Sequence, residues 1–200
     1  TNLTQDSTGT ITLNGTSTRA NRSAAAAIRL TNGLQTGNGV LNLIANGPTG
    51  ARGFSATNLT QSGNGTITGT ASTGYGISAH SVGTLTQSGN GSIVLTGSGG
   101  STSDVDSAIG ITNLTQTGAG SVVLNGTGTG STGSAAAVTV TNLTQNGTGS
   151  AVLSGRNTGS GFGVVVTNLA QNGNGSVVLN GSSDSANFSV YGIFLTNGLQ

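Results

Sequence analysis

The pentapeptide TNLTQ, or a close variant of it, recurs throughout this chain and limits how the chain can fold. Unaltered copies begin at Thr1, Thr57, Thr112 and Thr141, and the variants TNGLQ, GTLTQ and TNLAQ stand at equivalent places. Every copy keeps its glutamine, and successive glutamines lie 26 to 30 residues apart. Repetition at this period is typical of solenoids, in which each repeat packs against its neighbours. We therefore predict one repeat array over residues 1–200, a segment of a longer solenoid, with rungs ending near Gln5, Gln35, Gln61, Gln87, Gln116, Gln145, Gln171 and Gln200.

Alternation of aliphatic and polar residues predicts short strands within each repeat. Aliphatic residues stand six and eight positions after most glutamines, as Val122 and Leu124 do after Gln116. A second alternation precedes the next glutamine, and the L-T-Q end of the motif, such as Leu143–Gln145, is expected to form a third, very short strand. Three short strands per repeat, with no helical periodicity, predict an all-β, right-handed parallel β-helix of about seven rungs, because parallel crossovers are almost always right-handed.

Glycine stands two and four positions after nearly every glutamine, as Gly118 and Gly120 do after Gln116. We expect this pair to form a tight turn in which glycine adopts positive φ. The stretch between the two strand signals varies in length and holds nearly all the charges, so it is expected to be a surface loop.

The asparagine and the glutamine of the motif are predicted to stack in two structural ladders. Identical amides one rung apart can hydrogen bond along the column, and asparagine also tolerates left-handed φ at a tight corner. Thr84 interrupts the asparagine column, and we expect this to be its weakest point. The asparagine ladder consists of Asn2, Asn32, Asn58, Asn113, Asn142, Asn168 and Asn197, and the eight glutamines named above form the other ladder.

Composition excludes several functions. The net charge of +1 provides no basic field for nucleic acid or for an anionic membrane surface. No apolar run approaches the ~20 residues of a transmembrane helix. The absence of cysteine removes disulfides, thiol catalysis and thiolate metal sites. We therefore expect neither a nucleic-acid partner nor membrane insertion.

The titratable residues form no convincing catalytic or metal-binding set. Asp104 and Asp106 are close in sequence but fall in one variable loop, and we interpret them as solvated charges, with an oxygen-ligand cation site as the weaker alternative. His80, the only histidine, occupies an inward position that is Ile, Val or Phe in the other repeats, which indicates a local substitution in the stack. We predict that the protein is not an enzyme and binds no cofactor or metal.

The position seven residues after each glutamine should face outward, yet it carries valine in the later repeats. An outward valine stripe is a candidate lateral contact between filaments or with another chain, and cover by the adjacent variable loop is the alternative. The stripe consists of Val94, Val123, Val152 and Val178.

The repeat pattern of Thr112–Val140, TNLTQTGAGSVVLNGTGTGSTGSAAAVTV, resembles the repeats of filamentous-haemagglutinin-like exoproteins. These include two-partner-secretion and autotransporter passengers and β-strand-repeat surface proteins. The resemblance covers the whole chain and rests on the style of the repeat, since no diagnostic site is present. It implies a secreted right-handed β-helix that serves as an adhesin stalk, surface fibre or sheath.

We therefore expect an extracellular, cell-surface structural segment, a fibre or shaft that assembles with copies of itself end to end or laterally. The alternative is an adhesin that binds surface glycans through variable loops such as Arg19–Ser23 and Ser101–Asp106. An ice-binding protein is less favoured because the repeated threonines straddle a corner and form no flat array. A polysaccharide-cleaving enzyme is less favoured because convergent acids are missing.

Overall fold

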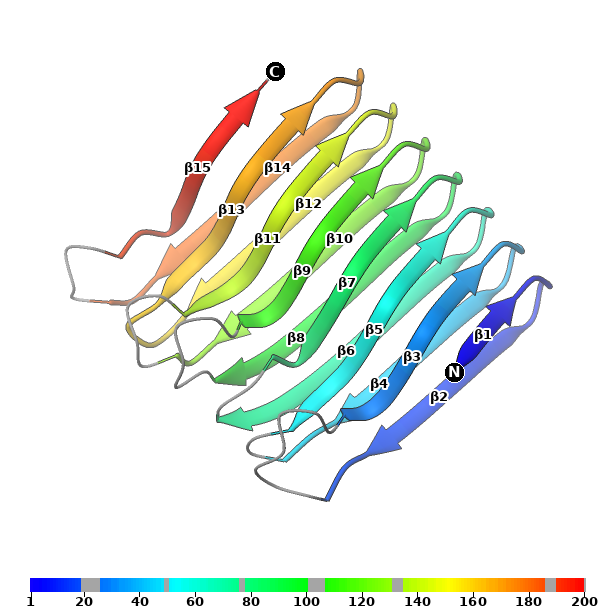
Figure 1. Ribbon diagram of the computed structural model, residues 1–200, viewed down its shortest axis with the longest axis horizontal. Coiled ribbons are helices and arrows are strands. Elements are labelled where there is room, and N and C mark those ends of the chain that lie inside the picture. The colour runs from blue at the N-terminus through cyan, green and yellow to red at the C-terminus, as the bar shows by residue number, and fades with distance from the viewer. Residues whose placement is uncertain are drawn as a thin grey trace.

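A computed structural model describes residues 1–18, 26–48, 51–75, 78–100, 107–130, 135–185 and 190–199. These residues contain β-strands and no helix, and the strands form two parallel sheets that face each other (Figure 1). Sheet A consists, in spatial order, of β1 (Asn2–Gln5), β3 (Ala26–Gln35), β5 (Arg52–Gln61), β7 (His80–Gln87), β9 (Ser107–Gln116), β11 (Ala136–Gln145), β13 (Phe162–Gln171) and β15 (Ile193–Leu199). Sheet B consists of β2 (Thr10–Thr16), β4 (Val40–Asn46), β6 (Thr66–Tyr75), β8 (Ser92–Gly100), β10 (Ser121–Gly128), β12 (Ser150–Asn157) and β14 (Ser176–Ser183).

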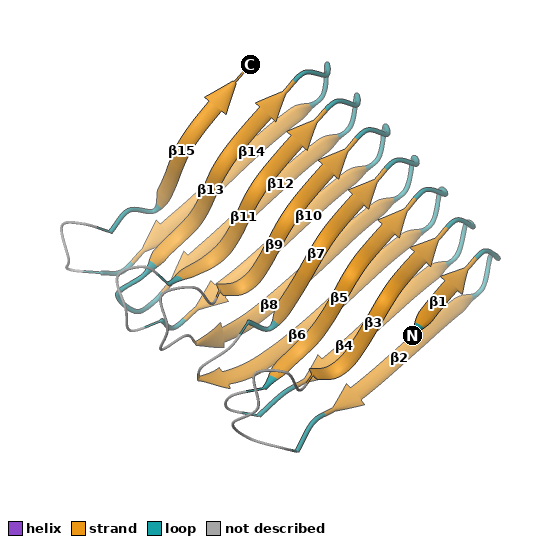
Figure 2. Cartoon of the chain, viewed as in Figure 1, coloured by secondary structure: helices purple, strands orange, loops and turns teal. Residues whose placement is uncertain are grey.

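The chain coils regularly between the two sheets. Each strand pairs in parallel with its equivalent one repeat away, so that residues at the same place in the repeat lie side by side. The strands of sheet A point toward the short glycine corners, and the strands of sheet B point away from them (Figure 2). The chain advances along the stack in a right-handed sense. The prediction of a parallel β-solenoid is confirmed. The stack comprises about six turns, slightly fewer than the seven expected.

Each turn contains two strands, and the prediction of three short strands was wrong. In β5, Thr57 is exposed and Asn58 half-buried, whereas Ala56 and Leu59 are buried on either side of them. The register with β3 also skips Thr57, because Leu30 pairs with Ala56 and Asn32 pairs with Asn58. The backbone therefore bends at the Thr-Asn pair but stays extended, and the expected third strand continues the second. The asparagine lies within a strand and not in a turn.

The hydrophobic core lies between the sheets and is built of aliphatic columns. Val122 and Leu124 of β10 are fully buried, as the alternation predicted, and face Val138 and Val140 of β11. Burying each such side chain contributes about 1.5–3 kcal/mol to folding. Because the register places like residues above one another, each turn covers the apolar surface of the next.

The glycine corners are required by close stacking and not by positive φ. None of the glycine pairs that follow Gln35 to Gln171 has φ between +20° and +160°, so the expected left-handed conformation is absent from these corners. A Cβ at Gly120 would instead overlap the carbonyl oxygen of Gly91 and the side-chain amide of Gln87 in the preceding turn. Similarly, a Cβ at Gly118 would overlap the backbone around Gly89. Glycine is thus the residue that lets successive corners approach closely.

Candidate functional surface

The motif glutamines face into the solenoid and form a hydrogen-bonded column. The described side chains from Gln5 to Gln145 are at most 1% exposed. From Gln35 to Gln145, each amide nitrogen donates to the side-chain oxygen of the glutamine one turn earlier; Gln116 Nε2, for example, lies 2.9 Å from Gln87 Oε1. Five such bonds run without a gap from Gln5 to Gln145, with distances of 2.9–3.2 Å.

Each glutamine also closes its own corner. Gln116 Nε2 lies 2.6 Å from the carbonyl oxygen of Gly118 and 3.2 Å from that of Gly120. The same two contacts recur at the other glutamines of the column. The glutamine and the two glycines therefore keep the same spacing in each repeat because one side-chain amide bonds both to the preceding turn and to the carbonyl groups of its own corner.

The column ends in the described structure after Gln145. Gln171 Nε2 donates to the carbonyl oxygen of Gly175 at 2.8 Å but makes no bond to Gln145. Gln145 Oε1 is consequently buried without a hydrogen-bond donor. Gln200 lies outside the described residues.

The asparagines form a second ladder on the outer surface of sheet A. Asn32 donates to Asn2, and Asn58 donates to Asn32, each at 2.8 Å between Nδ2 and Oδ1. The bonding resumes between Asn113 and Asn142 and continues through Asn168 to Asn197 at 2.8–2.9 Å. Thr84 pairs with Asn58 and Asn113 in the backbone register but makes no side-chain hydrogen bond to either. The ladder is thus divided at the position that the sequence singled out.

His80 lies in the core, where its inward position had placed it. Its side chain is fully buried, its Nε2 donates to the carbonyl oxygen of Thr96 at 2.9 Å, and its ring packs edge-on against Phe54 with centroids 5.8 Å apart. Burial lowers the pKa of His80 from 6.5 to about 4, and the bond to Thr96 opposes this shift. Gly69 stands across the core, where most repeats carry leucine, and a Cβ there would lie 3.1 Å from His80 Cε1. The missing leucine side chain therefore makes room for the imidazole, a pairing that sequence reasoning missed.

The four valines of the candidate lateral contact lie side by side on the outer face of sheet B. The register joins Val94 to Val123, Val123 to Val152, and Val152 to Val178. The first three are half-buried and Val178 is 39% exposed. Thr68 continues the same column toward the N-terminus. The stripe is an apolar line on an otherwise polar surface.

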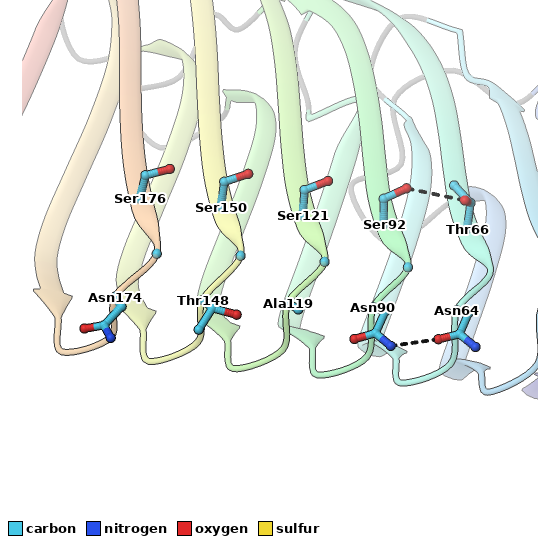
Figure 3. A pocket seen from close by; sticks show the side chains of 14 residues that line it. Asn64, Thr66, Asn90, Ser92, Ala119, Ser121, Thr148, Ser150, Asn174 and Ser176 are labelled. Atoms are coloured by element: carbon cyan, nitrogen blue, oxygen red, sulfur yellow. Dashed lines mark hydrogen bonds between the residues drawn. The ribbon is translucent and has the colours of Figure 1, made fainter.

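A shallow trough of about 670 Å³ follows the edge of sheet B, beside the glycine corners (Figure 3). Hydroxyl groups of Thr66 and of a serine column line one side, and a mixed column of corner residues lines the other. Ser92 Oγ donates to Thr66 Oγ1 at 3.3 Å, and Asn90 Nδ2 donates to Asn64 Oδ1 at 3.1 Å. The lining contains no charged or aromatic side chain. The trough is therefore a neutral hydrogen-bonding surface.

Charged residues are scattered over the described structure. Arg156 and Asp184 form an exposed ion pair at 3.0 Å. Asp104 and Asp106 lie outside the described residues, as do Arg19 and Arg22. Within the described ranges, no three His, Cys, Asp or Glu residues lie close enough together to hold a metal ion.

Searches for relatives of this chain found no matching protein-family model, curated protein or solved structure. In the part of the chain that the structure describes, no helix has the length and apolar character needed to cross a membrane.

Proposed function

We propose that this chain is a structural segment of an extracellular fibre or shaft on a cell surface. The observation that carries the proposal is the buried glutamine ladder. Five consecutive side-chain bonds connect six turns through the interior, in addition to the backbone pairing of both sheets. An interior in which the same hydrogen bonds recur in successive turns favours a stiff column whose length follows from the number of repeats.

The last described strand suggests how such a column grows. Ile193 and Leu195 of β15 are 41% and 42% exposed, whereas their partners Val164 and Val166 in β13 are fully buried. A further turn laid on β15 would bury them and would pair the free strand edge. We propose that a second copy supplies such a turn, so that copies join end to end, with lateral contact through the valine stripe as a second mode.

Electron microscopy and sedimentation of the purified chain over a range of concentrations test this proposal. We expect rods with the width of one solenoid that lengthen as the concentration rises. Leu195→Lys should prevent lengthening, because it buries a charge at the junction, whereas Thr196→Lys on the same strand places the charge outside. Val152→Lys should abolish side-by-side bundles, and Thr127→Lys provides the matched control on sheet B. Isolated particles of constant size at every concentration would overturn the proposal.

A carbohydrate- or surface-binding adhesin is the alternative role. The loops that the sequence assigns to this role, Arg19–Ser23 and Ser101–Asp106, lie outside the described residues. This role stays a prediction, and a glycan array with the intact chain is the direct test. Failure of every glycan to bind would count against it. Protease treatment of intact cells would test the surface location separately.

A further inference from the structure

A depression of about 370 Å³ interrupts the outer face of sheet A in the middle of the stack. It lies where two outward columns lose their side chains. Gly83 stands in a column that carries threonine in the neighbouring turns, at Thr57 and Thr112. Gly110 stands between Ser81 and Thr139 in the next column.

Hydroxyl groups surround this depression. They belong to β7, β9 and β11 and to Ser78, which lies two residues before the start of β7. Ser107 Oγ and Thr139 Oγ1 are 2.5 Å apart, and the backbone nitrogen of Ser107 donates to Ser78 Oγ at 3.4 Å. Ser78 and Ser107 are only 7% and 5% exposed, so their hydroxyl groups form a fixed wall of the depression. The hydroxyl-bearing lining residues are Ser78, Ser81, Ser107, Thr112, Thr139 and Thr141.

Arg52 is the charged residue of the lining. It begins β5, and its Nε is buried without a hydrogen-bond partner. None of the described residues accepts a hydrogen bond from its guanidinium or forms an ion pair with it. In contrast, Arg156 is paired with Asp184 although both are largely exposed. A partly buried guanidinium without a partner is unusual, because its planar donors match a carboxylate closely.

The ligand chemistry follows from this lining. The guanidinium favours an anionic group, and serine and threonine hydroxyls both donate and accept hydrogen bonds, as sugar hydroxyls do. The volume lies at the lower end of the range for small-molecule pockets and exceeds the needs of a lone inorganic anion. We propose that this depression binds a carboxylate-bearing sugar unit of a glycan, with the carboxylate on Arg52 and the sugar hydroxyls on the surrounding serines and threonines. This proposal does not depend on the fibre role.

Calorimetric titration of the whole chain with an oligosaccharide of uronic acids tests the proposal. Arg52→Gln should weaken binding by roughly tenfold or more, since a hydrogen bond to a charged group is lost. Arg29→Gln, which removes an exposed arginine from sheet A, should leave binding unchanged. A neutral oligosaccharide of the same length should bind at least tenfold more weakly, roughly as the Arg52 variant does.

Filling the depression gives a second, independent test. A Cβ at Gly110 would lie 3.7 Å from Ser78 Oγ, which is ordinary contact, so Gly110→Thr should fold and should block the site. Ser55→Thr changes the same column two turns away and serves as its control. Equal binding by the Gly110 or Arg52 variant would overturn the proposal. Equal binding of the neutral sugar, or full competition by inorganic phosphate, would overturn it as well, because the site would then recognise no acidic sugar.

Discussion

The turn formed by β6 and β7 and the turn formed by β10 and β11 have the same fold but differ in their interiors. The second turn carries the repeat's usual residues, with Leu124 facing Val138 and Asn142 in the outer ladder. The first carries Gly69, His80 and Thr84 at the equivalent places, and its pairing with β8 shifts register between Ser72 and Tyr75. Even so, β7 pairs in register with both of its neighbours.

The comparison shows which parts of the repeat can change. A core position can change when the residue facing it changes too, as Gly69 and His80 do. The TNGLQ variant behaves similarly, because the space above Gly33 is occupied by the side chains of Leu59 and Leu30. Both turns, however, keep the glutamine, as Gln87 and Gln145. We infer that the buried amide has no local substitute, since it bonds the stack and the corner at once.

Removing an amide from the middle of the glutamine column should have the largest effect. Gln116→Met keeps an unbranched side chain of similar length but loses the bonds to Gln87, Gly118 and Gly120 and the bond received from Gln145. The two protons of the Gln116 amide serve three acceptors, so with the bond received from Gln145 the loss amounts to about three full bonds. At about 1 kcal/mol for each, the corner should be destabilised by roughly 3 kcal/mol. Hydrogen exchange of the corner amides measures this locally, which suits a repeat protein that need not unfold in one step.

Gln171→Met is the matched control, because Gln171 donates only to Gly175. Its effect should be about 1 kcal/mol. Equal protection factors in the two variants would show that the glutamine column contributes no more to stability than a single surface bond.

The second prediction concerns the pH dependence of the β6–β7 turn. The pKa of His80 is about 4 in the folded chain and 6.5 when unfolded, so the unfolded chain binds the extra proton first as pH falls. The contribution of neutral His80 to stability is therefore complete above about pH 6.5 and is lost as pH falls toward 4. The loss should be about 3 kcal/mol over that window. Urea denaturation at successive pH values measures it.

The control restores the usual core pair with the double variant Gly69→Leu/His80→Ile. Neither residue of the new pair titrates, so this part of the pH dependence should disappear while the solenoid still folds. The same loss of stability in the double variant would show that another group causes it.

The sequence predicts the parallel solenoid, the inward and outward positions of the strands, and the interruption at Thr84, because each rests on a period that repeats many times. It predicts the corners less well. The glycines seemed to need positive φ, yet the actual constraint is the carbonyl of the preceding turn, which lies about 30 residues away in sequence. The bend at Thr57 and Asn58 was read as a boundary between strands, because outward polar pairs occur at turns and at bends alike. The depression at Arg52 depends on single departures in three different repeats, and no periodic signal reports those.

The smallest effect is expected where the outer ladder is interrupted. Thr84→Asn places an amide between Asn58 and Asn113, which pair with this position in the register. The new side chain can donate to Asn58 and accept from Asn113, as Asn142 does with its neighbours. Because the ladder is largely exposed to water, the two bonds together should stabilise the β6–β7 turn by only about 1 kcal/mol. Thr84→Ser, which adds no amide, is the control for the change in size and branching. If both variants protect the backbone amides of β7 from hydrogen exchange equally, the asparagine ladder adds nothing to the stability of this turn beyond the backbone pairing.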